Sequence, residues 1–100
     1  MHDAAKRNSI AEVRSEVDAI DREIVRLLGR RAGLVRDAVR FKKDEDDIRS
    51  PDHMAAFMDK RRGWAAESGE DADFVSRIYR VVTEHSVTVQ TALWRQQHPK

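Results

Sequence analysis

The chain has no cysteine, only two prolines and four glycines, and no long hydrophobic run. Without cysteine it can form neither a disulfide framework nor a zinc site made of thiolates. So few turn residues argue against a fold of many short strands, and a hydrophobic content of 40% is too high for a disordered chain. No apolar stretch approaches the roughly 20 residues that cross a bilayer, and the polar start MHDAAKRNS lacks the features of a signal peptide. We therefore expect a soluble protein of the cytoplasm.

Neither sign of charge dominates the chain. Its 19 lysines and arginines are balanced by 18 aspartates and glutamates, which gives a net charge of +1 at pH 7. Such a balance creates no general attraction to nucleic acid or to an anionic membrane, so we expect neither as a partner. One hundred residues make one domain, and a domain of this size has a thin core unless the chain oligomerises.

Apolar residues recur every three or four positions over the first forty residues, as a heptad seam does: Ile10, Val13, Val17, Ile20, Ile24, Leu27, Leu34, Ala38 and Phe41. The seam predicts a helix from about Ile10 to Lys42, capped by Asn8 or Ser9, after a flexible segment at residues 1–9. This helix would be about 50 Å long, whereas a compact domain of 100 residues has a radius of gyration of about 13 Å. We infer that a second copy covers the seam in an intertwined dimer.

Two further helices are predicted after a charged loop at residues 43–47, whose acids lack the spacing of a metal-binding loop. Ser50 as N-cap and Pro51 at the first position begin one helix, which ends at Ser68-Gly69. Asp71 caps the last helix, which ends within residues 94–97. Its apolar stripe is predicted to face the core: Phe74, Ile78, Val81, Val82, His85, Val89 and Leu93. The fold class is therefore all-α, with three helices in one domain over residues 10–97.

One charged residue falls inside the seam of the first helix. Heptad counting from Ile10 places Arg31 at an a position, where a desolvated and unpaired guanidinium would cost several kcal/mol. Its anion is either a carboxylate of a partner helix, such as Asp18 or Asp21, or a bound ligand. Lys42 follows about three turns later, roughly 16 Å along the helix, so both long side chains can reach one small ligand.

Arg14 lies on the same helix, about 25 Å from Arg31 and too far away to share that ligand. In an antiparallel dimer the partner subunit's Arg14 returns to the site. Taken alone, Arg14 and Lys42 are typical of solvated surface residues. Together with Arg31, they would form two cationic sites in an apolar bundle, which favours a small dianion as the ligand.

The last helix carries Val82, Ser86 and Gln90 on one stripe beside its predicted core face. Serine and glutamine at this spacing can hydrogen-bond a ligand inside a helical bundle. The alternative is a polar flank that faces water. His85 and His53 are ambiguous, because packed or half-exposed histidines are more common than catalytic ones.

Five segments, VRSEVDAIDREIV, LGRR, RFKK, IRSPD and WAAESGEDADFV, resemble the isochorismate-pyruvate lyase branch of the all-α chorismate mutase family over about residues 10–97. The segment EHSVTVQTAL is instead similar to the final helix of the mutases. The resemblance implies a small dicarboxylate substrate, chorismate or isochorismate, and an interlocked homodimer with two shared sites. It also implies no cofactor and no metal, because both reactions are pericyclic.

The resemblance assigns roles to particular residues. Arg14 from the partner chain and Arg31 would hold the two carboxylates of the ligand, and Lys42 and Gln90 would contact its ether oxygen. Ser86 matches a further carboxylate contact of the mutases.

This chain departs from the family pattern at two places. His53 stands where the family has another arginine, so one carboxylate contact is weaker or depends on pH. Ser50 and Met54 stand where the mutases place acids near the hydroxyl group of the substrate.

Three functions follow from these patterns. Ser86 and EHSVTVQ favour a mutase that converts chorismate to prephenate, which is the function we expect. Met54, LGRR and RFKK favour an isochorismate-pyruvate lyase that releases salicylate and pyruvate. A non-catalytic helical dimer, used for binding or regulation, is the third, and His53 would then mark a site that has lost its activity.

Overall fold

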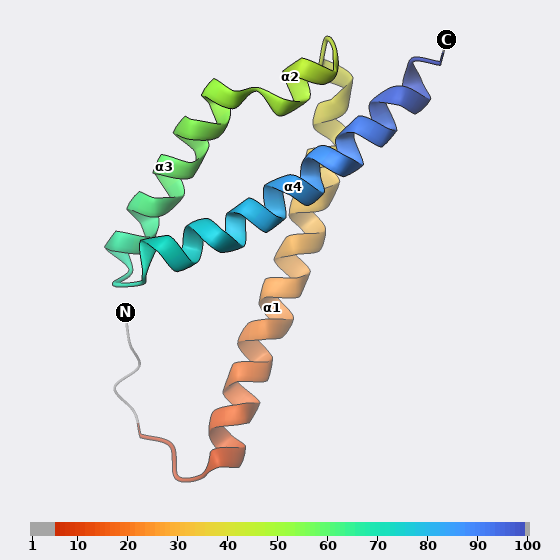
Figure 1. The fold of residues 1–100 in the computed structure, drawn as a ribbon. Coiled ribbons are helices and arrows are strands. Elements are labelled where there is room, and N and C mark those ends of the chain that lie inside the picture. The colour runs from red at the N-terminus through yellow and green to blue at the C-terminus, as the bar shows by residue number, and fades with distance from the viewer. Residues whose placement is uncertain (1–5, 100) are drawn as a thin grey trace. The chain divides into compact units, whose positions relative to one another are not determined.

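The structure, a computed structural model, describes residues 6–99, and this part of the chain contains no strand. Its three long helices are α1 (Ile10–Asp37), α3 (Pro51–Glu67) and α4 (Ala72–Gln97), and the short helices η1 (Ala38–Phe41) and α2 (Glu45–Arg49) lie between α1 and α3 (Figure 1). The prediction of an all-α fold with three main helices is confirmed. Of the segment at residues 1–9 that was expected to be flexible, residues 1–5 lie outside the described residues. Within the described range no helix is long and apolar enough to cross a membrane.

The chain divides after Leu34 into two parts. In the first part, α1 begins where the sequence predicts, because Ser9 Oγ accepts a hydrogen bond from the backbone N–H of Glu12 at 3.1 Å. The Glu12 carboxylate in turn accepts from the backbone N–H of Asn8 at 2.8 Å. No residue of α1 is buried, and the exposed fractions of its seam residues run from 40% at Val13 to 65% at Leu34. The seam is therefore uncovered in the single chain.

The second part begins at Val35 and contains the last turn of α1. The α-helix was predicted to run to about Lys42, but it ends at Asp37 and tightens into the 3-10 helix η1. The backbone N–H of Lys42 closes this helix by donating to the carbonyl oxygen of Val39 at 3.0 Å. Val39 is almost completely buried and anchors η1.

The prediction of a charged loop at residues 43–47 is wrong for its second half, which forms the start of α2. Asp44 is the N-cap and accepts from the backbone N–H of Asp47 at 2.8 Å, while the Asp47 carboxylate accepts from the backbone N–H of Lys43 at 3.1 Å. Acidic residues in a first helical turn also interact favourably with the helix dipole. The acidic run is thus a helix start, and buried Ile48 holds the short helix in place.

Helix α3 begins at Pro51 as predicted, but the side chain of Ser50 makes no capping hydrogen bond. Ser50 also ends α2, because its backbone N–H donates to the carbonyl oxygen of Asp46 at 2.9 Å. This double position puts Ser50 at φ 26° and ψ 78°, in the left-handed region, where the hydroxyl does not cap α3. At the other end, Gly69 has a φ of 72° and terminates α3 where the sequence predicts.

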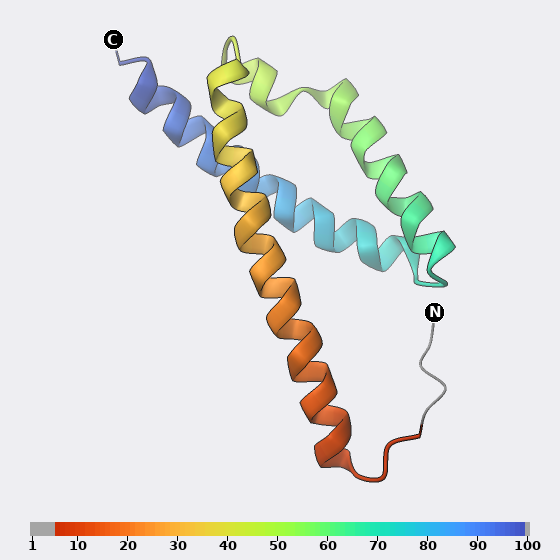
Figure 2. The ribbon, with the colours of Figure 1, turned by 180° about the vertical axis from the view of Figure 1, so that it is seen from behind.

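Helices α3 and α4 meet at their connecting turn and diverge away from it like the two arms of a V, as both views show (Figures 1 and 2). Asp71 caps α4 as predicted, accepting from the backbone N–H groups of Asp73 and Phe74 at 2.9 and 3.3 Å. Arg62 of α3 donates to Ser76 Oγ at 2.8 Å and pairs with the Asp73 carboxylate at 2.9 Å. These contacts hold α3 and α4 together at the end that lies next to their connecting turn.

The prediction of the core face of α4 is wrong for the chain on its own. The buried residues of α4 are polar and lie seven positions apart: Ser76, Thr83 and Gln90, with exposed fractions of 6–8%. Of the predicted apolar stripe, Phe74 and Ile78 are nearly half exposed and Val81 is 67% exposed. The other aliphatic residues of the stripe, Val82, Val89 and Leu93, are half-buried. The apolar stripe is therefore only partly covered in the single chain, and polar residues occupy the most buried positions of α4.

Candidate active site

Gln90 lies on the buried side of α4 and hydrogen-bonds to the chain near the end of α1. Its Nε2 atom donates to the carbonyl oxygen of Val35 at 2.8 Å. A carboxamide nitrogen carries two hydrogens, so this bond uses one of them and fixes the plane of the group. The second N–H is then held in a constant direction, as a preorganised donor requires.

Lys42 stands where the chain leaves η1, with an extended backbone at φ −85° and ψ 138°. Its side chain is half-buried. On one side the buried Val39 fixes its backbone, and on the other the hydrogen-bonded turn between Lys43 and Asp47 does so. Lys42 and Gln90 thus belong to the same part of the chain, the part that begins at Val35.

Ser86 lies one turn before Gln90 on α4 and is half-buried. Its Oγ atom donates to the carbonyl oxygen of Val82 at 2.9 Å, within its own helix. A contact to a carboxylate needs this hydrogen, so the O–H must turn about the Cβ–Oγ bond, away from Val82, before it can donate to a ligand.

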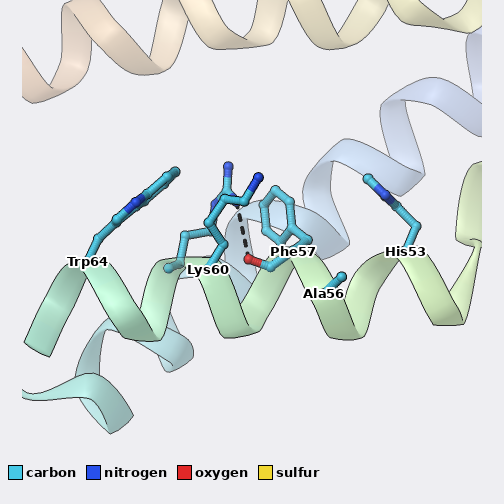
Figure 3. A pocket seen from close by; sticks show the side chains of 6 residues that line it. His53, Ala56, Phe57, Lys60 and Trp64 are labelled. Carbon is cyan, nitrogen blue, oxygen red and sulfur yellow. Dashed lines mark hydrogen bonds between the residues drawn. The ribbon is translucent and has the colours of Figure 1, made fainter.

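His53 is exposed in the first turns of α3 and borders a hollow of about 410 Å³. Figure 3 shows His53, Phe57 and Trp64 projecting from the same side of α3. The hollow is lined by His53, Ala56, Phe57, Lys60, Arg61 and Trp64, and not by Lys42, Ser86 or Gln90. The structure therefore places His53 on a different surface feature from the buried amide of α4.

Arg61 adds a positive charge to the lining of this hollow. Its guanidinium carbon lies 3.4 Å from the ring centroid of Phe57, 4.9 Å from that of Trp64 and 5.3 Å from that of Tyr79. Phe57 and Tyr79 also meet edge to face at 6.0 Å, which joins α3 to α4. Basic groups over aromatic rings suit an anion that carries an apolar ring. The sequence places Phe57, Arg61 and Trp64 on one face of this helix, but the sequence analysis assigned them to no site.

A second hollow, of about 440 Å³, lies between α4 and the start of α3. Met54 and the buried Thr83 line it, together with Arg49, Glu84, Val87 and Thr88. The sequence resemblance implies that Met54 stands where mutases carry an acid. Its apolar side chain offers no hydrogen bond to a hydroxyl group. Thr83 was not identified from the sequence, where the only signal was its position seven residues from both Ser76 and Gln90.

Arg14 and Arg31 belong to the first part of the chain, up to Leu34. Arg14 is exposed on α1, whereas Arg31 is half-buried. Their distances to a ligand depend on how the two parts and a partner chain are arranged, so their binding role stays a prediction.

Comparison with known proteins gives one family. The family model described as chorismate mutase type II matches residues 13–91. The isochorismate pyruvate lyase of Pseudomonas aeruginosa is 39% identical over 87 residues, which cover 87% of this chain and 86% of that protein. The chorismate mutase of Methanocaldococcus jannaschii is 27% identical over 82 residues, or 81% and 83% of the two chains. The bifunctional chorismate mutase/prephenate dehydratase of Buchnera aphidicola is also 27% identical, but the chain spans only 23% of it.

Proposed function

Because the chain belongs to the chorismate mutase type II family, we propose that it catalyses the rearrangement of chorismate to prephenate. The observation that carries the proposal is the extent of the family match, since residues 13–91 include every residue that the sequence analysis assigned to the site. The rearrangement is pericyclic: the ether C–O bond breaks while a C–C bond forms within the same molecule. The protein therefore needs to hold the reactive conformer and to stabilise the charge that grows on the ether oxygen.

In this proposal Lys42 and Gln90 stabilise that oxygen. Each preorganised donor is worth about 3–4 kcal/mol of barrier. The hydrogen bond from Gln90 to Val35 supports the assignment, because it leaves one N–H with a fixed direction. Because the carboxamide is neutral, its donation needs no protonation, and activity should persist at neutral and mildly alkaline pH.

The carboxylates of the substrate are assigned to the arginines. Arg31 and the partner subunit's Arg14 would each take one carboxylate, as a guanidinium fork does. Ser86 would add a hydrogen bond after its hydroxyl turns away from Val82, and His53 would make a weaker contact than an arginine. No metal or cofactor enters this reaction.

The proposed enzyme is a homodimer with two shared sites. Only three hydrophobic residues of the described part of the chain are buried, namely Val39, Ile48 and Ala65. The seam of α1 is exposed, and so are Phe74, Ile78 and Val81 of the apolar stripe of α4. Apolar helix faces that are exposed on this scale are typical of a protein–protein interface, and a second copy carries the matching faces. The proposal places the dimer in the cytoplasm, where a chain without cysteine is unaffected by a reducing environment.

A specific observation favours a second activity. Identity to the Pseudomonas aeruginosa lyase reaches 39% over most of both chains, against 27% for the mutase of Methanocaldococcus jannaschii. The same cations could hold isochorismate while a hydrogen moves from the ring to the enolpyruvyl carbon and the C–O bond breaks. Met54 supports this alternative, because its apolar side chain gives no contact to the hydroxyl group that distinguishes chorismate.

One incubation separates these possibilities. The purified protein is mixed with equal amounts of chorismate and isochorismate, and the products are resolved by chromatography. Prephenate as the dominant product supports the mutase, and salicylate with pyruvate supports the lyase. Neither product above the uncatalysed background, together with no thermal shift on a bicyclic dicarboxylate transition-state analogue, would instead support a binding or regulatory dimer.

The role of Lys42 is tested by replacing it with alanine. We expect turnover to fall at least about a hundredfold, the size of one lost donor at the ether oxygen. Lys43→Ala is the matched control, because Lys43 is adjacent and exposed and contributes only its backbone N–H to a hydrogen bond. A loss of less than about threefold in Lys42→Ala would remove Lys42 from the mechanism.

A further inference from the structure

A forked ion pair joins the segment after Lys42 to the helix that carries Gln90. Arg95 Nε donates to Glu45 Oε2 at 3.0 Å, and Arg95 Nη2 donates to Glu45 Oε1 at 2.6 Å. Glu45 opens α2, and Arg95 stands five residues after Gln90, about 7.5 Å further along α4. Two parallel hydrogen bonds fix direction as well as distance, which a single contact does not.

The segment that carries Glu45, residues 43–47, is held together by its own hydrogen bonds. The backbone N–H of Lys43 donates to the Asp47 carboxylate at 3.1 Å, and the backbone N–H of Asp47 donates to the Asp44 carboxylate at 2.8 Å. Residues 43–47 therefore move as one unit, and Lys42 is attached directly to it. A restraint on Glu45 is transmitted to Lys42 through this closed turn.

The backbone on either side of Lys42 is held in different ways. Before Lys42, buried Val39 and the hydrogen bond from Gln90 to Val35 fix η1 against α4. After Lys42, buried Ile48 provides an apolar contact, which resists separation but has no preferred direction. The fork between Glu45 and Arg95 supplies the directional restraint on that side.

We propose that Glu45 and Arg95 are positioning residues, whose ion pair sets the place of Lys42 relative to Gln90. This inference rests on the proposed function, in which both donors meet one ether oxygen. A displacement of about 1 Å at a reacting centre can cost about a hundredfold in rate. Breaking the pair should lower kcat more than it changes KM, because the carboxylates of the substrate are held by other residues.

A double-mutant cycle with Glu45→Gln and Arg95→Gln tests the pair. We expect each single variant to lower kcat about tenfold with KM within about twofold of the wild type, and the double variant to lose no more than either single one. Asp73→Asn is the matched control, because it breaks another ion pair between helices, the one with Arg62 at the opposite end of α4. Its kcat should stay within about twofold of the wild type. Single variants within twofold of the wild type, or losses that multiply in the double variant, would overturn the pair as a positioning device.

A second measurement keeps this inference separate from the proposed function. If the wild type turns over neither substrate, or if Lys42→Ala keeps its activity, the proposed function has failed. Hydrogen exchange at the backbone amides of Lys43 and Asp47 then tests the restraint by itself. We expect several-fold faster exchange in Glu45→Gln and unchanged exchange in Asp73→Asn, and equal rates in both variants would overturn the restraint.

Discussion

Replacing Gln90 with glutamate tests the buried amide of α4, because the substitution keeps the shape of the side chain and changes its hydrogen-bonding character. Gln90 is 8% exposed and donates to the carbonyl oxygen of Val35 at 2.8 Å. A carboxylate at this place would set a negative oxygen against a carbonyl oxygen, whereas a protonated carboxyl group can donate as the amide does. Burial and the hydrogen bond to the neutral form both raise the pKa of the introduced carboxyl group.

The size of the effect follows from linkage between protonation and folding. The ordinary pKa of a glutamate is about 4.3, and each unit by which folding raises it costs about 1.4 kcal/mol of unfolding free energy at high pH. A rise of about two units, within the range known for buried carboxyl groups, gives about 2.7 kcal/mol. As the pH rises, the introduced carboxyl group ionises first in the unfolded state, so the loss of unfolding free energy is absent below about pH 4. It grows as the pH rises through 4.3 and levels off above the raised pKa, near pH 6–7.

Thermal unfolding at a fixed protein concentration, from pH 4 to pH 8, measures this loss. About 2.7 kcal/mol corresponds to a midpoint roughly 10–20 °C below that of the wild type at pH 8. Gln96→Glu is the control, because it adds the same carboxyl group at an exposed position of α4 and should follow the wild type at every pH. In the proposed enzyme, Gln90→Glu should be active only at acid pH, where it can still donate. An equal midpoint difference at pH 4 and pH 8 would refute the reasoning.

Three further predictions concern the helices and their contacts. Ile24→Asp places a charge in the exposed seam of α1, so we expect this variant to be a monomer where the wild type is a dimer. Light scattering measures the molar mass of both, and an unchanged mass would argue against the seam as the interface. Arg62→Ala should lower the unfolding free energy by about 1–3 kcal/mol, because it removes a hydrogen bond to the buried hydroxyl of Ser76; an unchanged midpoint would contradict this. The hydrogen bond from Arg95 lowers the pKa of the Glu45 carboxyl group, so the pair stabilises the fold above the ordinary pKa of a glutamate, and this stabilisation is lost as the pH falls through the lowered pKa. The midpoint difference between Glu45→Gln and the wild type should accordingly be constant from pH 8 to about pH 5.5 and disappear in stronger acid.

The helix boundaries that the sequence predicted correctly are those set by local chemistry. Ser9 and Asp71 accept backbone hydrogen bonds at the starts of α1 and α4, and Pro51 and Gly69 mark the limits of α3. Each of these signals depends on residues within one turn, so a sequence pattern contains all the required information. At Ser50 the same reasoning failed, because one residue both ends α2 and begins α3.

The faces of the helices were harder to predict, because burial depends on what covers a helix. The apolar stripe of α4 was assigned to the core, yet Ser76, Thr83 and Gln90 are the buried residues. A stripe that faces a partner chain and a stripe that faces the core of its own chain have the same periodicity. For the site, the sequence pointed to Gln90 through its spacing from Ser86, but the bond to Val35 spans 55 positions and has no local signal.

The 3-10 helix η1 changes the direction in which the side chain of the next residue, Lys42, leaves the backbone. A 3-10 helix advances about 120° and 2.0 Å per residue, against about 100° and 1.5 Å in an α-helix. Over the four residues Ala38–Phe41 the difference amounts to roughly 80° of rotation and 2 Å of length. Lys42 therefore lies at a different angle around the axis of α1 from the one that heptad counting predicts. The winding of these four residues thus sets the direction of the Lys42 side chain, and a substitution that favours an α-helical turn there would redirect this side chain without replacing it.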